Sequence, residues 1–390
     1  KSLEFIAARL SKPVAYFLED EEQQRRRQER EIDINAAAAL LSRPTAAQAL
    51  LRARDLLDGA SAPSEICRLR LITGSALNHL VRGNEALQDL AIAERIAVQL
   101  GDTGTHLRVR YQLALAFRHS GNSKRARDML EALLADIERD QVVDRPFRLK
   151  VLKDLGAFCI ELGEVEVAHS YFLMALEWAK DMGDISGLIT IYNGLGYAHR
   201  ALGDLDAAAG YLQKALASAE LSNDLAASVV MHNALAVLAA DRGHLPAAYR
   251  HVNKAIEIAR IVGPPGWVAH CLNTKAECLL KAGELDAAKL QAIEALDLAR
   301  ETDTDKAVAG AAMVIADVAL RRGEPGEAER HFGEAAAIYK KIGAITELGE
   351  VLMRLSKSAH DRGDDGLAQR FAAEAYEVRR MRSGLVERQS

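Results

Sequence analysis

The sequence predicts an all-α protein built from stacked helical hairpins. Of its 390 residues, 49% are hydrophobic, yet only 5% are aromatic and eight are proline. Alanine, leucine, arginine and glutamate predominate, and this composition favours packed helices over sheets. A glycine also recurs at nearly constant spacing, and small residues keep fixed distances from it. Such internal periodicity indicates an array of repeats.

The repeat is defined by eight glycines that each follow a helical stretch. They are Gly83, Gly121, Gly163, Gly203, Gly243, Gly283, Gly323 and Gly363, and their last five intervals are forty residues each. Seven residues before them lie the small residues Ala76, Ala114, Gly156, Gly196, Ala236, Ala276, Ala316 and Ser356. Alanine recurs five residues after the glycine, from Ala126 to Ala368, and twelve residues after it, from Ala175 to Ala375.

Each repeat is expected to be a helix, a turn and a second helix that packs antiparallel on the first. Glycine in the turn tolerates the left-handed backbone that ends the first helix. The small residues let the two helices approach closely, and Leu155, Leu195, Leu235 and Ile315 supply larger core side chains. Because one hairpin cannot bury its apolar face alone, neighbouring hairpins stack into a solenoid.

This pattern resembles the tetratricopeptide repeat family. The resemblance covers about nine hairpins over residues 32–382, and the first hairpin, Ile32–Gly59, is degenerate. It implies a right-handed superhelix, whose domain we place at residues 34–382, followed by a tail at 383–390. The period exceeds the usual ~34 residues of the family, which predicts longer helices.

The first nineteen residues follow a different pattern. Residues 3–10 are amphipathic, Pro13 suits the first turn of a helix, and Tyr16 and Phe17 form a compact apolar group. Residues 1–19 resemble the last two helices of a Cro/C1-type helix-turn-helix domain, beyond its recognition helix. The alternative is a hairpin that caps the solenoid. Since the first residue is lysine, we expect that the natural start, with the DNA-reading helices, is missing.

Residues 20–33 carry no apolar face and are predicted to form a charged linker helix, stabilised by charge pairs four residues apart. Two alternatives stay open. Gln23, Gln24 or Gln28 would be catalytic if the chain acts as the Rap response-regulator phosphatases do, which share this repeat. Arg25–Arg27 would contact a phosphate backbone, although interleaved glutamates weaken that interpretation.

Three asparagines occupy the same position in successive first helices. Asn193, Asn233 and Asn273 each lie ten residues before the turn glycine, although helix interiors disfavour asparagine. Positions thirteen, ten, six and three before the glycine share one helical face. In tetratricopeptide arrays that face lines the concave groove. Because an amide both donates and accepts, such a ladder can hold the backbone of an extended peptide of about six residues.

The same stripe gives the predicted groove two charged ends. The basic residues toward the N-terminal repeats are Arg108, Arg118, Lys150, Lys153 and Arg200. The acidic residues toward the C-terminal repeats include Glu277 and Asp317, and apolar contacts are expected from Tyr197, Val230, Val237 and Met313. We expect the carboxylate of a bound peptide near Lys153 and Arg118, and its amino terminus near Glu277 and Asp317.

Other functional classes have little support. The net charge is −5, there is no apolar run long enough to span a membrane, and no signal peptide begins the chain. Four cysteines without a CxxC pair are expected to be buried and reduced. His199 is expected to be a hydrogen-bonded core residue, and His232 and His270 lack ligands at metal-binding spacing. With no catalytic or nucleotide-binding motif, we expect no enzyme, no metal and no cofactor.

A partial helix-turn-helix domain, a charged linker and tetratricopeptide hairpins together resemble the RRNPP group of bacterial quorum-sensing regulators. The resemblance implies a cytoplasmic homodimer that binds a short signalling peptide in its groove and thereby controls DNA binding and transcription. Two other classes stay open: a Rap-like phosphatase or sequestering protein that acts on a response regulator, and a plain protein scaffold. A full-length sequence without a recognition helix would favour the Rap-like class.

Overall fold

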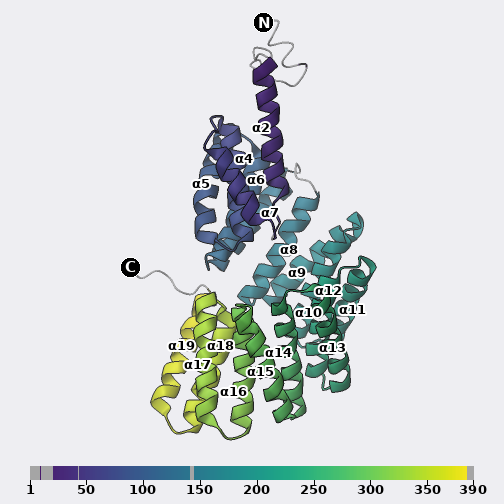
Figure 1. Cartoon of the computed structure of the whole chain (residues 1–390), viewed down its shortest axis with the longest axis vertical. Coiled ribbons are helices and arrows are strands. Elements are labelled where there is room, and N and C mark those ends of the chain that lie inside the picture. The colour runs from purple at the N-terminus through teal and green to yellow at the C-terminus, as the bar shows by residue number, and fades with distance from the viewer. Residues whose placement is uncertain (1–8, 10–20, 43, 141–144, 384–390) are drawn as a thin grey trace. The chain divides into compact units, whose positions relative to one another are not determined.

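The computed structural model describes residues 9, 21–42, 44–140 and 145–383. These residues form 18 helices and none of them lies in a strand, so the all-α prediction is confirmed (Figure 1). The chain divides into two compact units, residues 1–143 and 144–390. The repeat domain predicted at 34–382 is therefore shared between two units. The predicted helix-turn-helix remnant, except Arg9, lies outside the described residues, as does the tail from residue 384.

The first unit starts with a long polar helix, α2 (Glu21–Ala39), which contains most of the predicted linker. Its end is anchored, because Ile34 and Ala37 are buried in a cluster with Ala53 and Leu69. The other helices of this unit are α3 (Ala46–Leu57), α4 (Pro63–His79), α5 (Gly83–Leu100), α6 (Thr103–His119) and α7 (Ser123–Asp140).

The second unit consists of antiparallel hairpins in sequence order (Figure 1). Their first helices are α8 (Arg145–Leu162), α10 (Ile185–Ala201), α12 (Leu225–Asp241), α14 (Pro265–Ala282), α16 (Asp305–Arg321) and α18 (Ile345–Asp361). Their second helices are α9 (Val165–Met182), α11 (Leu205–Leu221), α13 (Leu245–Val262), α15 (Leu285–Glu301), α17 (Pro325–Ile342) and α19 (Asp365–Ser383).

The predicted core positions are buried. Leu155 and Leu195 are fully buried, and Leu235 and Ile315 are at most 5% exposed. The small positions are also needed sterically: a Cβ atom on Gly196 would lie 2.7 Å from the side chain of Leu212 in the partner helix. Real Cβ atoms do not approach so closely, so these positions set the distance between the two helices of a hairpin.

The first turn departs from the predicted rule. From Gly121 to Gly363, seven of the eight repeat glycines have left-handed backbone, with φ between 74° and 84°. Gly83 does not: it is the first residue of α5, and Val81 takes the left-handed conformation with φ of 60°. Gly83 serves a close approach instead, because a Cβ atom there would lie 2.6–2.8 Å from backbone atoms at the end of α6.

Counting from Val81 restores the regular repeat. Val81 lies forty residues before Gly121. Gly74 then takes the small position before the turn, where a Cβ would clash with a leucine of α5, and Ala86 and Ala93 take the buried positions after it. The next interval is 42 residues long and contains the boundary between the two units. The glycine pattern alone therefore misplaced the first turn by two residues.

The connections between hairpins are also specified locally. Left-handed residues end the second helices at Gly101, Gly183, Asn223, Asp303 and Gly343. Asp102, Asp184 and Asp224 then cap the following first helices, each accepting a backbone N–H at 2.9–3.0 Å. Because every turn fixes its own hairpin, the array needs few long-range contacts to set its register.

The strained Val81 gives a first prediction. Val81→Gly should stabilise the protein by about 0.5–1 kcal/mol, since glycine avoids the cost of a left-handed β-branched residue but is more flexible when unfolded. Val81 is 57% exposed, so the change removes little buried surface. Urea titrations measure the effect. The control is Gly121→Val, which should lose stability because Gly121 has left-handed backbone. A lower stability for Val81→Gly would mean that residue 81 is not left-handed.

A second prediction tests the core of the second unit. Leu235→Ala should cost about 2–5 kcal/mol, because it leaves a cavity in the cluster with Leu212 and Met231. The matched control is Leu221→Ala on α11, whose side chain is 77% exposed and should cost less than about 0.5 kcal/mol. Equal losses in the two variants would show that Leu235 is not a core residue.

Candidate functional site

The first helices of the hairpins in the second unit form a continuous row. α10 contacts α12, α12 contacts α14, and α14 contacts α16. Packed helices lie about 8–10 Å apart, so equivalent residues of successive repeats follow one another at this spacing. We call the positions thirteen, ten, six and three residues before Gly203, Gly243, Gly283 and Gly323 the inner stripe. This stripe contains the predicted asparagine ladder.

Asn193 on α10 is the member of the ladder that can accept a ligand. Its side chain is half-buried, and its amide makes no hydrogen bond to any other residue that the structure describes. Tyr197 lies one turn further along the same stripe and is 48% exposed. This part of α10 therefore presents an amide without a hydrogen-bond partner among the described residues, and an exposed phenol ring lies beside it.

Asn233 on α12 is partly committed to the next helix. Its Nδ2 atom lies 3.4 Å from Nε2 of His270 on α14. Burial and the nearby Lys306 lower the pKa of His270, so its ring is neutral at pH 7 and Nε2 can accept the amide proton. A peptide carbonyl would have to replace this histidine as the partner of Asn233.

Asn273 on α14 has a structural role instead. It is only 4% exposed, and its Nδ2 donates to the carbonyl oxygen of Ala307 in α16 at 2.7 Å. Gly310 makes room for this bond, because a Cβ atom there would lie 3.0 Å from Nδ2. A buried amide must find a partner, and the backbone of the neighbouring helix is within reach. The three asparagines therefore do not form a ladder of equivalent, open amides.

Two of the predicted charges are already paired across neighbouring helices. Nε of Arg200 lies 2.6 Å from Asp241, and Lys281 pairs with the other carboxylate oxygen of the same residue. Asp317 pairs with Arg354 on α18. Arg200 and Asp317 would have to leave these partners to bind a peptide. Asp241 and Lys281 were missed in the sequence because they lie two residues before the turn glycine, just outside the stripe.

Glu277 on α14 differs from these paired residues. Its side chain is exposed and makes no ion pair with any residue that the structure describes. Yet desolvation by the surrounding protein raises its pKa, against the opposing attraction of Lys281 and Arg200. Such a carboxylate is suited to receive an incoming cation.

The predicted basic residues fall in different units. Lys150 and Lys153 lie on α8 of the second unit, whereas Arg118 lies near the end of α6 in the first. Arg118 and Lys150 already interact with other residues. Lys153 is half-buried and has no ion pair within the described part of the chain, so it is the basic candidate that the second unit offers. The charge gradient along the whole groove stays a prediction.

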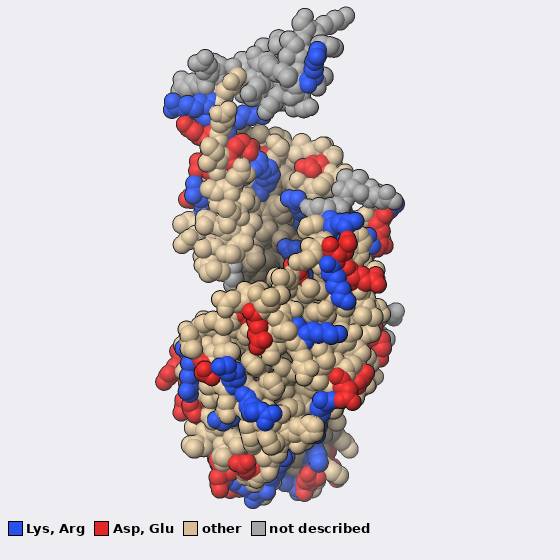
Figure 2. Space-filling view, turned by 90° about the vertical axis from the view of Figure 1, so that its right-hand side faces the viewer, with Lys and Arg blue, Asp and Glu red and all other residues tan. Residues whose placement is uncertain are grey.

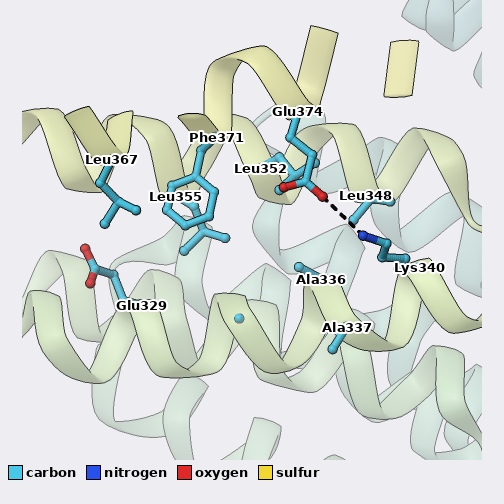
Figure 3. Close-up of a pocket in the computed structure, with 11 residues that line it drawn as sticks. Glu329, Ala336, Ala337, Lys340, Leu348, Leu352, Leu355, Leu367, Phe371 and Glu374 are labelled. Atoms are coloured by element: carbon cyan, nitrogen blue, oxygen red, sulfur yellow. Dashed lines mark hydrogen bonds and ion pairs between the residues drawn. The ribbon is translucent and has the colours of Figure 1, made fainter. Parts of the chain in front are cut away.

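A second hollow, of about 340 Å³, lies between α17, α18 and α19 (Figure 3). Figure 3 shows the Lys340–Glu374 pair at one end of it and Glu329 at the other. Its apolar lining includes Ala336, Leu348, Leu352, Leu355, Leu367 and Phe371. The hollow can therefore accept an apolar side chain.

The equivalent hollow eighty residues earlier is polar. Lys275 and Gln291 line it where Leu355 and Phe371 line the later one. The two hollows share an ion pair at the same end, Arg260–Glu294 in the earlier repeat and Lys340–Glu374 in the later one. The apolar character of the last hollow is therefore a property of its own side chains and not of the repeat.

Within the described residues, no group of three or more His, Cys, Asp or Glu side chains could hold a metal ion. No helix among them is long and apolar enough to cross a membrane. The four cysteines are buried free thiols, and burial raises the pKa of Cys271 and Cys278 to about 11. These two thiols are therefore protonated at neutral pH and unsuited to nucleophilic attack.

Comparison with known proteins supports the repeat architecture. A tetratricopeptide repeat model matches residues 144–220, and no curated protein matches the sequence. A Rap protein complexed with Competence and Sporulation Factor has a similar structure, with a TM-score of 0.64 and 12% identity over 92% of this chain and 99% of that one.

Two structures of the quorum sensor NprR are also similar. The apo form from B. thuringiensis gives a TM-score of 0.64 at 12% identity, over 90% of this chain and 99% of that one. NprR in complex with its cognate peptide NprX gives 0.54 at 15% identity, over 78% and 96%. At such low identity these similarities concern the fold, and they confirm a tetratricopeptide superhelix.

A third prediction follows from the raised pKa of Glu277. Glu277→Gln should stabilise the fold at pH 7, because it removes a poorly solvated charge; since solvent screens the side chain, the gain should stay below about 1 kcal/mol. The folded state binds this proton more tightly than the unfolded state. Ionised Glu277 is therefore destabilising at neutral pH. The gain should decline once the pH falls below the raised pKa of the folded state, and it should vanish below the ordinary glutamate pKa of the unfolded state.

Denaturant titrations of both proteins between pH 7 and pH 4 measure this difference. Glu257→Gln is the control, since Glu257 is 60% exposed and pairs with Lys254 on the same helix. The control should show no gain at pH 7. A loss of stability in Glu277→Gln would contradict the inferred desolvation.

Proposed function

We propose that the second unit is the receptor for a short linear peptide, which lies along the inner stripe of α10, α12 and α14. The observation that carries this proposal is the combination of an uncommitted amide at Asn193 and an unpaired carboxylate at Glu277 on the same stripe. Peptide binding by proteins of similar fold gives further support, because NprR has been solved with its cognate peptide.

The positions of these residues determine the size of the peptide. Asn193 and Glu277 are two helix spacings apart, roughly 16–20 Å, which about five or six residues of extended chain cover. Asn193 holds a peptide group, Tyr197 packs against a side chain, and Glu277 receives the amino terminus or a basic side chain. The carboxyl end of the peptide then points toward Lys153 on α8. Asn273 contributes by fixing α14 against α16 rather than by touching the peptide.

We further propose that peptide binding regulates transcription, through a homodimer in the cytoplasm whose helix-turn-helix domain includes residues 1–19. The protein would then have no enzyme activity of its own. Figure 2 shows basic and acidic side chains interspersed on the face that it draws, without a continuous basic surface. With a net charge of −5 as well, we expect this chain by itself to bind DNA only nonspecifically in gel shifts.

A fourth prediction concerns peptide selection. A randomised library of six-residue peptides is passed over the immobilised chain, and the retained peptides are sequenced and measured by calorimetry. Asn193→Ala should weaken their binding by about 1–3 kcal/mol, because a bonded peptide group loses its partner. The same variant should keep its folding stability. Glu277→Gln should reduce the retention of peptides that carry a positive charge at one end.

Asn273→Ala is the matched control for this experiment. It should lower stability, because the carbonyl of Ala307 loses its donor, yet leave the affinity of the folded protein nearly unchanged. Peptide binding that is unaffected by both Asn193→Ala and Glu277→Gln would end the proposal for the inner stripe.

A fifth prediction separates a regulator from a phosphatase. Gln23, Gln24 and Gln28 all lie on α2, and Gln23 and Gln24 already interact with other residues. We expect that the chain does not accelerate dephosphorylation of a phosphorylated response-regulator receiver domain. A faster loss of phosphate that Gln28→Ala abolishes would instead establish the Rap-like function.

A further inference from the structure

Two pairs of histidines lie close together in the second unit. Nε2 of His169 on α9 is 3.2 Å from Nε2 of His199 on α10. Nδ1 of His232 on α12 is 3.0 Å from Nδ1 of His251 on α13. Sequence reasoning expected a bonded His199 but could not identify its partner, since the two residues are thirty positions apart.

We propose that His169 and His199 bind a divalent transition-metal ion, such as Cu²⁺ or Zn²⁺, between two successive hairpins. Two imidazole nitrogens at about 2.0–2.1 Å from a tetrahedral ion are roughly 3.3 Å apart, which matches the observed separation. The two nitrogens share a hydrogen bond in this structure, so the rings must turn until both Nε2 lone pairs point at the ion and the shared proton has left. The two rings come from helices of different hairpins. Water completes the coordination, because the described residues supply no third ligand. The bound ion is therefore exchangeable, and the site binds it with moderate affinity.

Asp204 prepares His199 for this role. One of its carboxylate oxygens lies 3.4 Å from Nδ1 of His199, and the other accepts the backbone N–H of Ala207 at 3.0 Å, which caps α11. A carboxylate beside Nδ1 favours the proton there and leaves the Nε2 lone pair available. Tyr211 stacks on the His199 ring at 5.2 Å between ring centroids. The ring is thus oriented before an ion arrives.

The electrostatic surroundings also suit a cation. Burial and the neighbouring His199 lower the pKa of His169, so at pH 7 it is neutral, as a metal ligand must be. Asp204 brings a negative charge to His199. The ammonium group of Lys214 is also nearby. It lies over the ring of Tyr211, 5.2 Å from the ring centroid, rather than between the two histidines. Both rings are half-buried, which leaves access for an ion and its water ligands.

The second histidine pair provides an internal control. It has a similar nitrogen separation, but positive charge lies near it: after burial, which is the main cause, Lys254 helps to lower the pKa of His232 and Arg250 that of His251. Glu220 on α11 opposes this only at His232. We therefore expect this pair to remain a neutral hydrogen bond between α12 and α13 and to bind no ion.

The test uses the full chain, prepared without a histidine tag and stripped of metal. It is titrated with CuCl₂ or ZnCl₂ in a calorimeter. One ion should bind per chain with micromolar affinity. His169→Gln and His199→Gln should each abolish this binding, and Asp204→Asn, which can still cap α11, should weaken it roughly tenfold. His251→Gln should leave it unchanged. Circular dichroism checks that each variant remains folded.

A measurement on the unaltered protein keeps the proposal falsifiable if a variant unfolds. The paramagnetic resonance spectrum of the copper complex should show coupling to two imidazole nitrogens. A spectrum without two such nitrogens would overturn the proposal. Binding that is equally tight in a His169→Gln/His199→Gln double variant would do the same, and the pair would then be only an N–H···N bond between hairpins.

Discussion

The close contact between the two helices of each hairpin is the constraint on which the rest of the structure depends. At Gly156 and Gly196 there is no space for even one methyl group, since a Cβ atom would lie 2.7 Å from Phe172 or Leu212. This contact fixes how each second helix lies on its first helix. Buried alanines such as Ala236 and Ala276 take the equivalent position in later repeats, so the hairpins keep a similar arrangement, and the contacting first helices α10, α12 and α14 bring equivalent residues side by side.

The fold was predictable because short-range patterns in the amino-acid sequence specify it. A turn residue, a small residue seven positions before it and alanines after it specify one hairpin, and repetition of the pattern makes its recognition secure. The error at Gly83 shows the limit of this reasoning. Glycine serves left-handed turns and close approaches alike, and the sequence does not distinguish the two uses. Only the buried Gly74, Ala86 and Ala93 show that the register runs from Val81.

The candidate site was less predictable, because side-chain pairing depends on neighbouring helices. A shared position suggested that Asn193 and Asn273 have one role, yet Asn273 bonds the backbone of α16 where Gly310 makes room. Arg200 and Asp317 proved to be paired with residues about forty positions away. The histidine pairs could not be found from spacing at all. What remains available to a ligand is a small set around Asn193, Tyr197 and Glu277, in which desolvation raises the pKa of the Glu277 carboxyl group.

The most direct test of this account is hydrogen–deuterium exchange of the full chain, with and without a peptide selected from the six-residue library. The account predicts that the peptide slows exchange in α10, α12 and α14, with little change in α17 and α19. Protection confined to the apolar hollow between α17, α18 and α19 would contradict it, and would place the peptide in the other candidate site.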